Sequence, residues 1–300
     1  MMYESQPQSR SRDPLPAISR RAFVATMAAA LTPAFGHSAW AQQSALPLKN
    51  LGLEHLDIVV PDTAESARFY RRIFDTALHE QPFQGSIRYF ILLGDLPSDR
   101  QVGYIAIGAA GDRPAGIGHY CALAEAYDRE GVNSALEAAG YPTASGGFGM
   151  IPDVDGIQLQ LFTLPAGLVT AAVPSDLSVE PGGLVEPVGM DHVLMRVSDM
   201  DRSLAYYRLM YGEGLESRDM ENEERIWFQL GAQTRLGLEP APAGQAPRLE
   251  RFGIKVRSFD SGRVSDGLEA VGADLLFASA GAGRVRFRDN YGIVLEIAAV

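Results

Sequence analysis

Two segments of the chain repeat the same pattern of apolar and polar positions. Residues 54–62 read EHLDIVVPD and residues 191–199 read DHVLMRVSD, so each has an acidic residue, a histidine, an alternating apolar run and, seven places after the histidine, an aspartate. Alternation with a period of two predicts a half-buried β-strand. After each aspartate, apolar residues recur at helical spacing, and the aspartate suits the N-cap because a carboxylate accepts from the free N–H groups of the first turn.

Two further segments carry a weaker form of the same unit. Residues 119–141 and 251–273 each begin with an alternating strand, have an aspartate nine residues on, and continue as a helix that is expected to end at Gly140 or Gly272. Further strand candidates lie at 87–93, 102–108, 157–163, 225–230, 234–239 and 292–298. The chain therefore predicts an α+β fold made of four tandem βαβββ-like units.

The four units are predicted to pair into two domains, residues 50–165 and 188–300. Equivalent positions in the two halves are separated by 137, 132 and 136 residues, and the halves end alike, on DVDGIQLQLF at 153–162 and DNYGIVLEIA at 289–298. The intervening segment 166–187 is rich in proline and shows no clear periodicity, which is typical of a linker.

The first 41 residues are interpreted as a targeting signal. Arg20 and Arg21 form a twin-arginine pattern, an alanine-rich apolar stretch covers 24–35, and Ala39-Trp40-Ala41 offers small residues for cleavage. The apolar stretch is shorter than the roughly 20 residues that span a bilayer. The sequence thus predicts a Tat signal peptide over residues 1–41 and a periplasmic protein.

The remaining chain is acidic and holds one cysteine. Removing four arginines and two acidic residues with the signal changes the net charge from −11 to −13. Such a charge argues against nucleic acid or an anionic membrane as partner, and no later segment is apolar enough to cross a membrane. Cys121 has no partner for an internal disulfide and is expected to be a small buried residue. The expected partner is a small-molecule substrate, and the sequence is also compatible with assembly into a homo-oligomer.

The strand-leading histidines and the D-x-D-G-x-x-x-Q ending resemble those of the vicinal oxygen chelate superfamily, which includes glyoxalase I, extradiol dioxygenases and bleomycin-resistance proteins. The resemblance covers nearly all of residues 50–300. It implies two domains with cupped mixed sheets and a divalent metal held by the first strand of each unit and the last strand of a unit. Those positions fall on His55, His119 and Gln160 in the first domain, and on His192, Arg251 and Glu296 in the second.

Residue chemistry favours the first domain as the metal site. Two neutral imidazoles and an oxygen donor leave coordination positions open for substrate or dioxygen. Gln160 departs from the glutamate of the dioxygenase branch, although glutamine is a ligand in the glyoxalase branch, and its neutral amide would leave the metal a stronger Lewis acid. Iron(II) is the expected ion, with manganese or zinc as alternatives. Arg251 cannot lose its proton to coordinate, so an ion pair with Glu296 is expected to fill the second site.

Strand parity predicts which side chains face the metal. Gln158, Gln160 and Phe162 share one face of their strand and are expected to point into the cup, whereas the other face is purely aliphatic and is expected to pack under the helices. Cys121 shares a face with His119 and is expected near the metal. No general acid or base can be assigned: the candidates are His79, Tyr89, Tyr104 and Tyr120.

The resemblance implies an exported, metal-dependent, dioxygenase-like oxidoreductase. Its substrate would be small and would place two neighbouring oxygens on the metal, as a catechol does. A glyoxalase-like lyase or isomerase is the alternative that Gln160 favours. In a third reading both histidines are ordinary buried residues, and the protein is a metal-free binding protein for a small molecule.

Overall fold

The alternating segments of the sequence form two eight-stranded mixed sheets in the computed structural model. The first sheet contains β1 (Asn50–Val60), β2 (Leu78–Phe83), β3 (Ser86–Asp95), β4 (Val102–Ala109), β5 (Gly116–Ala124), β6 (Met150–Pro152), β7 (Gln158–Thr163) and β8 (Val173–Pro174). The second contains β9 (Glu186–Val197), β10 (Glu216–Arg218), β11 (Ile226–Leu230), β12 (Thr234–Pro240), β13 (Arg248–Arg257), β14 (Asp274–Ser279), β15 (Arg284–Arg288) and β16 (Val294–Ala299).

The structure describes residues 45–300 except 96–101, 145–148, 164–170, 180–181 and 221. The predicted export signal over residues 1–41 therefore lies outside the described residues. The predicted linker is described in part, and its Val173–Pro174 segment forms β8, which pairs with β2 at the edge of the first sheet.

The two sheets share the order of seven of their eight strands, and the eighth strand, β8 or β14, lies at opposite edges. The strand orders are β6-β7-β5-β1-β4-β3-β2-β8 and β10-β11-β12-β9-β13-β16-β15-β14. In each sheet the leading strands of two units, β1 with β5 and β9 with β13, form a central antiparallel pair. The predicted α+β fold of tandem βαβββ-like units is confirmed.

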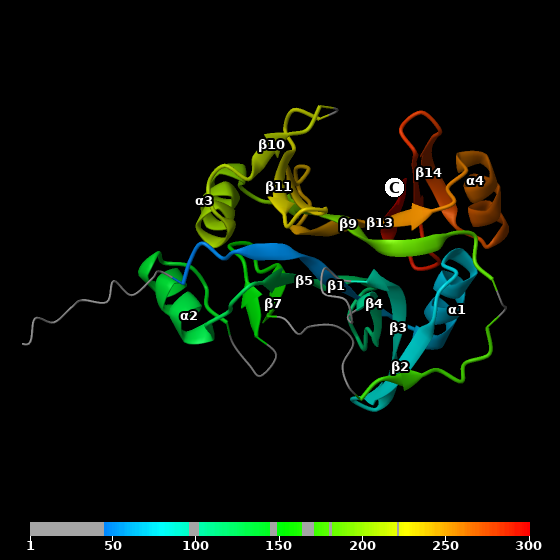
Figure 1. Cartoon of the computed structure of the whole chain (residues 1–300). Coiled ribbons are helices and arrows are strands. Elements are labelled where there is room, and N and C mark those ends of the chain that lie inside the picture. The colour runs from blue at the N-terminus through cyan, green and yellow to red at the C-terminus, as the bar shows by residue number, and fades with distance from the viewer. Residues whose placement is uncertain (1–44, 96–101, 145–148, 164–170, 180–181, 221) are drawn as a thin grey trace, which may run out of the picture. The chain divides into compact units, whose positions relative to one another are not determined.

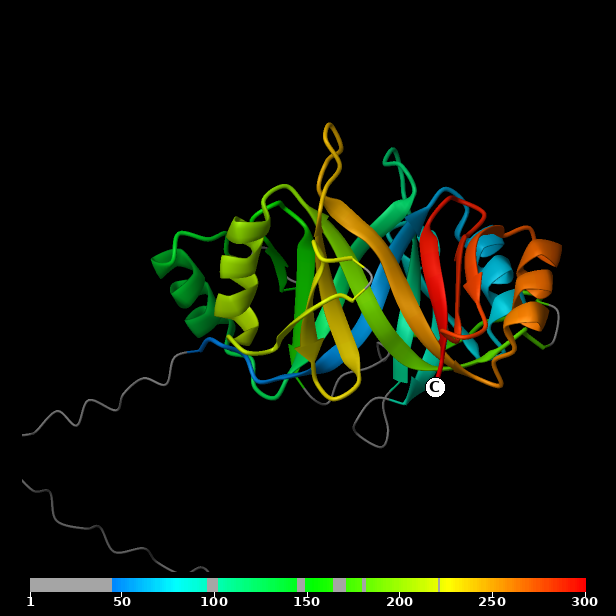
Figure 2. The same ribbon diagram turned by 90° about the horizontal axis from the view of Figure 1, so that it is seen from above.

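The four helices of the described residues begin where the aspartates predict. They are α1 (Thr63–Ile73), α2 (Arg129–Ala138), α3 (Met200–Tyr211) and α4 (Ser261–Ala270), with N-caps Asp62, Asp128, Asp199 and Asp260. The predicted stops Gly140 and Gly272 have φ of +76° and +87°, a left-handed conformation that glycine adopts without steric cost. Seen in two views, α2 lies beside α3 at one end, and α1 lies beside α4 at the other (Figures 1 and 2). None of the described helices is long and apolar enough to cross a membrane.

Two buried tyrosine–aspartate pairs link the halves of the chain. The Tyr70 hydroxyl of α1 donates to Asp289 at 2.9 Å, and the Tyr207 hydroxyl of α3 donates to Asp153 at 2.8 Å. The other oxygen of each aspartate accepts from two backbone N–H groups of its own turn. One continuous cluster of buried apolar side chains also spans both halves. The aspartates that lead the terminal turns thus join each half of the chain to a helix of the other.

Candidate metal centre

His55 and His119 meet on the central strand pair of the first sheet. In the antiparallel register of β1 and β5, His55 lies opposite Cys121 and His119 lies opposite Asp57. Both imidazoles are buried, and their Nε2 atoms are 3.1 Å apart. Two nitrogens bound at right angles to one ion, with bonds of about 2.1 Å, would be separated by about 3.0 Å. The spacing of the two imidazoles therefore fits a shared metal ion.

A carboxylate lies behind each imidazole. A β-bulge in β1 places Glu54 and His55 together against Cys121, so the buried Glu54 carboxylate hydrogen-bonds to His55 Nδ1. His119 Nδ1 lies 3.5 Å from Asp57 Oδ2. Carboxylates in this position hold the ring proton on Nδ1 and leave Nε2 as the ligand atom.

The pKa of His119 is lowered mainly by burial, and the charges of His55 and Arg88 add to this effect against the opposing influence of Asp57. His119 is therefore neutral, as a metal ligand must be. With both Nδ1 atoms facing carboxylates, two Nε2 lone pairs point at each other across 3.1 Å. They repel unless a proton or a cation lies between them, so the residues present fit a bound metal ion.

Gln160, the third predicted ligand, lies on a third strand. It lies opposite Cys121 in the parallel pairing of β5 with β7, so His55, Cys121 and Gln160 form a row across three strands. Neighbouring strands are about 4.8 Å apart, which puts the outer two residues of the row about 10 Å apart at Cα. The small Cys121 side chain between them leaves space for an imidazole and an amide to approach a common point.

All three predicted residues line one cavity of about 320 Å³, here called the first cup. Its walls are largely aromatic, formed by Phe83, Phe90, Tyr104 and Phe162. The Tyr104 ring stacks on His55 with centroids 4.6 Å apart and planes 9° apart. The parity prediction for β7 is confirmed for Gln160 and Phe162, which line the cup, and for the aliphatic face, which belongs to the apolar core. Gln158 does not line the cup, and its amide donates to the carbonyl of Gly156 instead.

Cys121 is fully buried beneath the cup. Its Sγ, a carboxylate oxygen of Glu54 and a ring nitrogen of His55 lie within 4.8 Å of one another. Burial raises the pKa of the Cys121 thiol, and the Glu54 carboxylate raises it further. The thiol therefore stays protonated and supports the site as a small side chain rather than as a thiolate ligand.

Comparison with known proteins finds no matching family model and no matching curated sequence. Solved structures do match. The 2,3-dioxygenase LapB from Pseudomonas sp. has a TM-score of 0.61 at 16% identity, covering 85% of this chain and 93% of that one. The Mn(II)-bound glyoxalase from Novosphingobium aromaticivorans has a TM-score of 0.61 at 16% identity, with coverage of 84% and 83%. Homoprotocatechuate 2,3-dioxygenase from Brevibacterium fuscum, in complex with 3,4-dihydroxyphenylacetate, has 0.59 at 16%, with coverage of 84% and 81%.

The chain has the vicinal oxygen chelate fold. At these identities the likeness establishes the fold alone, and the chemistry has to be argued from the side chains of each cup. Of the four acid–base candidates, Tyr104 lines the first cup, whereas Tyr120 is fully buried with its hydroxyl 3.5 Å from that of Tyr211. Burial raises the pKa of Tyr104, and the Glu54 charge adds to this, so its hydroxyl stays protonated.

The corresponding positions of the second sheet meet as well. His192 lies opposite Gly253 and Gly253 lies opposite Glu296, which repeats the row of the first cup. The expected ion pair of Arg251 with Glu296 is wrong. Glu296 instead pairs with Arg286 at 2.6 Å and more distantly with Arg284 at 3.8 Å, because β15 lies directly beside β16.

Sequence reasoning missed the carboxylates that orient the imidazoles. Glu54 directly precedes His55, and Asp191 directly precedes His192. Asp191 Oδ2 lies 2.8 Å from His192 Nδ1. The repeated acidic-His pair was the available signal. An alternating strand would point adjacent side chains to opposite faces, so the signal could be interpreted only once the bulges were seen.

Proposed function

We propose that this protein is a metal-dependent, dioxygenase-like enzyme of the vicinal oxygen chelate type, with His55, His119 and Gln160 as the metal ligands. The observation that carries the proposal is the pair of Nε2 atoms 3.1 Å apart, each on an imidazole whose Nδ1 faces a carboxylate. A divalent ion held by two imidazoles and one amide oxygen would retain open positions for two neighbouring substrate oxygens and would act on them as a Lewis acid.

The rest of the first cup suits a flat aromatic substrate. Phe90 and Tyr104 pack edge to face with centroids 5.5 Å apart, and Phe162 closes the wall beside His55. The volume of about 320 Å³ lies at the small end of ligand pockets, which are typically about 300–1,000 Å³. A catechol ring would bury its apolar faces against these walls and direct its two oxygens toward the imidazoles.

Two polar groups of the cup can position the substrate. The protonated Tyr104 hydroxyl can donate a hydrogen bond to an oxygen that becomes negative, although it cannot act as a base near neutral pH. Arg88 donates to Asp57, and its guanidinium lies 4.7 Å from the centre of the Phe83 ring. This ion pair keeps Asp57 in place behind His119 and brings a positive charge to the cup wall.

A glyoxalase-like lyase or isomerase is the second candidate, and Gln160 is the observation that favours it. A neutral amide in place of a carboxylate leaves more positive charge on the metal, which favours polarisation of a carbonyl or enediolate over electron transfer to dioxygen. The Mn(II)-bound glyoxalase among the structural neighbours is consistent with this choice.

Elemental analysis of protein matured through its own export route tests the proposal. We expect close to one equivalent of iron, manganese or zinc in the wild type and in the control His192→Ala, and loss of that metal in His119→Ala, with folding of each variant checked by circular dichroism. Oxygen uptake with catechols would support the dioxygenase, and bound metal without oxygen uptake would support the lyase. Wild-type protein that holds an organic ligand but no metal would overturn the enzyme proposal.

We also propose export to the periplasm by the twin-arginine route, on the pattern at Arg20 and Arg21. Cell fractionation should recover the wild-type protein from the periplasm. The double variant Arg20→Lys, Arg21→Lys should stay in the cytoplasm, and a periplasmic double variant would count against this route.

A further inference from the structure

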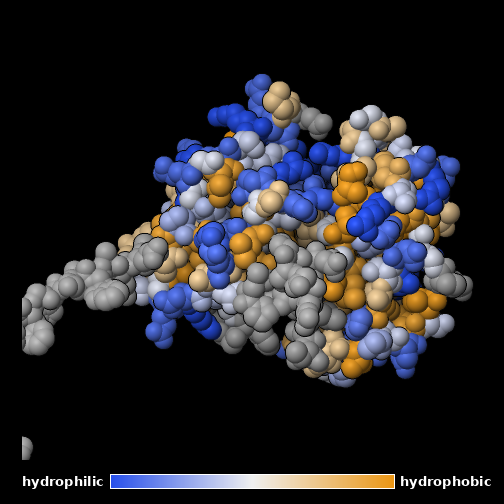
Figure 3. Space-filling model, viewed as in Figure 1, coloured by the Kyte–Doolittle hydropathy of each residue, from blue (hydrophilic) through white to orange (hydrophobic). Residues whose placement is uncertain are grey.

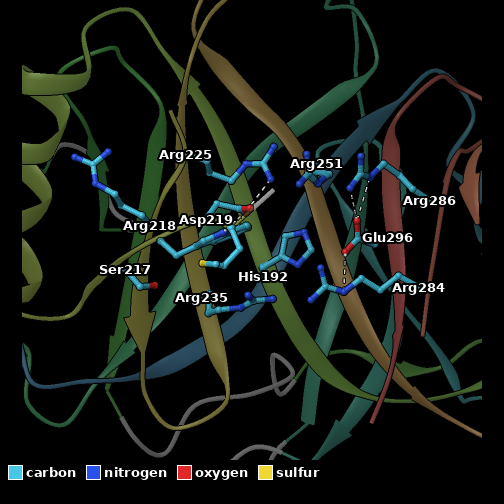
Figure 4. Close-up of a pocket in the computed structure, with 12 residues that line it drawn as sticks. His192, Ser217, Arg218, Asp219, Arg225, Arg235, Arg251, Arg284, Arg286 and Glu296 are labelled. Carbon is cyan, nitrogen blue, oxygen red and sulfur yellow. Dashed lines mark hydrogen bonds and ion pairs between the residues drawn. The ribbon is translucent and has the colours of Figure 1, made fainter. Parts of the chain in front are cut away.

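The second sheet contains a cavity of about 260 Å³, here called the second cup, at the position that corresponds to the first cup. Six arginines line it, against two carboxylates, in a chain whose net charge is −11. The arginines come from separate parts of the second sheet. Arg225, Arg235, Arg251 and Arg284 lie around His192, whereas the side chain of Arg218 points away from it (Figure 4). The surface view also shows hydrophilic residues gathered between β11 and β14 (Figure 3). The arginines are Arg218, Arg225, Arg235, Arg251, Arg284 and Arg286.

Two of these charges are neutralised within the protein. Arg225 pairs with Asp219 at 2.9 Å and with Glu239 at 2.7 Å, and Arg235 pairs with Asp191 at 3.0 Å. These pairs hold the guanidinium groups at one wall of the second cup. They contribute little net positive charge, so the case for an anion site depends on the other four arginines.

The carboxylates nearby are too few to neutralise those four arginines. Arg284 and Arg286 share the single carboxylate of Glu296, and Arg218 donates to a backbone carbonyl at 3.3 Å. The side chain of Arg251 makes no hydrogen bond or ion pair with any other residue that the structure describes. It is only 6% exposed, and its Nε atom is buried without an acceptor.

The strand register explains why Arg251 lacks a partner. Arg251 lies opposite Leu194, at the position where His119 of the first cup lies opposite Asp57. The carboxylate that orients the histidine has therefore been replaced by an aliphatic side chain, and the histidine by an arginine. Burial of Arg251, together with the nearby charge of Arg286, lowers its pKa to about 10, so it remains charged at neutral pH. Glu296 and Glu239 are near enough to raise this pKa, but neither pairs directly with the guanidinium. A buried cation without a hydrogen-bond acceptor is unfavourable, and a bound anion would remove that penalty.

His192 adds a second unsatisfied group to the same cavity. Its Nδ1 faces Asp191 at 2.8 Å, whereas its Nε2 is buried and has no hydrogen-bond partner. Burial lowers the pKa of His192 despite the nearby Asp191, so the imidazole is neutral and Nε2 is an acceptor. A hydroxyl group on the ligand could donate to it.

We propose that the second cup binds a small oxyanion with at least two negative charges, held by Arg251 and Arg284 and distinct from the metal site of the first cup. Planar guanidinium forks bind carboxylate and phosphate oxygens in pairs, so an organic dicarboxylate or a phosphate provides the chemistry that these arginines recognise. A hydroxy-dicarboxylate would in addition satisfy His192.

Isothermal titration of the full protein at constant ionic strength tests this inference with four probes: malate, succinate, inorganic phosphate and acetate. We expect saturable binding of malate or of phosphate and at least tenfold weaker binding of the monoanion acetate. Binding of malate alone would identify an organic acid as the ligand source, and binding of phosphate alone a phosphate compound. Tighter binding of malate than of succinate would support the contact with His192.

Matched variants locate the site. Arg251→Met and Arg284→Gln should each weaken binding at least tenfold, and Arg257→Gln, which removes an exposed arginine paired with Glu186, should not. Should Arg251→Met fail to fold, Arg284→Gln, at a side chain that is 36% exposed, still tests the site. The metal content of the first cup should be the same in all three variants, so a failure of this inference can be distinguished from a failure of the proposed function. Absence of saturable binding to the wild type, or equal loss in Arg257→Gln, would overturn the inference.

Discussion

The buried carboxylate behind His55 offers the sharpest test of the first cup. Glu54 is fully buried, and one of its oxygens bonds to His55 Nδ1 while the other has no partner among the described residues. Glu54→Gln removes the charge and keeps the size of the side chain. Loss of a carboxylate that orients a metal-bound histidine typically weakens metal affinity about 10–100-fold, or about 1.4–2.7 kcal/mol. We expect a loss in this range.

The stability of the metal-free protein should be unchanged or higher in Glu54→Gln. A buried carboxylate oxygen without a partner is unfavourable, and the glutamine keeps an amide oxygen that can accept from His55 Nδ1. Weaker metal binding with an equal or higher unfolding temperature in the presence of a chelator would show that the carboxylate acts through His55. A merely damaged fold would lower both quantities.

Competition titration against a chromogenic chelator measures the affinity, with zinc or manganese as the probe ion. The matched control is Asp191→Asn, which changes the corresponding carboxylate of the second cup, 2.8 Å from His192 Nδ1. This control should bind metal as the wild type does. Wild-type affinity in Glu54→Gln, or an equal loss in Asp191→Asn, would refute the assignment of the metal to the first cup.

Three further changes test the fold around the two cups. Tyr207→Phe leaves the buried Asp153 carboxylate one donor short and should cost about 1–3 kcal/mol in denaturant unfolding, so an unchanged midpoint would count against the link between the halves. Burial raises the pKa of Asp153 above 3.8 despite the hydrogen bond from Tyr207. Just above that pH the native state therefore binds more protons than the unfolded chain, and stability falls as the pH rises through the folded pKa. Asp153→Asn should flatten this part of the thermal stability profile, and an unaltered profile would contradict the assignment. In Gly231→Ala the new Cβ would collide with the backbone oxygen of Leu51 at φ +58°, which should cost at least about 2 kcal/mol. Gly85→Ala, at φ +79° with nothing within 4 Å, should cost about 1–2 kcal/mol, and equal losses in the two would show that the collision is absent.

The starts of the four units were predictable because their signals are local. Strand alternation, an N-cap aspartate and a glycine stop each involve residues within a few positions of one another. The strands β10 and β14 were missed for the converse reason. Both are edge strands with mostly exposed side chains, so little burial imposes an alternating pattern on them.

The side chains of the first cup were predictable in part. The parity of β7 indicated that Gln160 faces the cavity, because a strand has a fixed period of two. The contribution of Glu54 depends on a bulge, which interrupts that period. The expected pair of Arg251 with Glu296 failed because Arg286 lies directly opposite Glu296 on the neighbouring strand, a contact that no spacing along the chain encodes.

The sequence by itself determined the repeat, and the repeat determined two similar sheets, because periodicity and capping act over one or two turns of chain. Only the tertiary structure decided which buried charges found partners. Tyr70 reaches Asp289 across 219 positions, and the arginines of the second cup come from several strands of one sheet. Strand register and bulges determine these contacts, because hydrogen bonds and ion pairs depend on distances of about 3 Å that the order of residues does not specify.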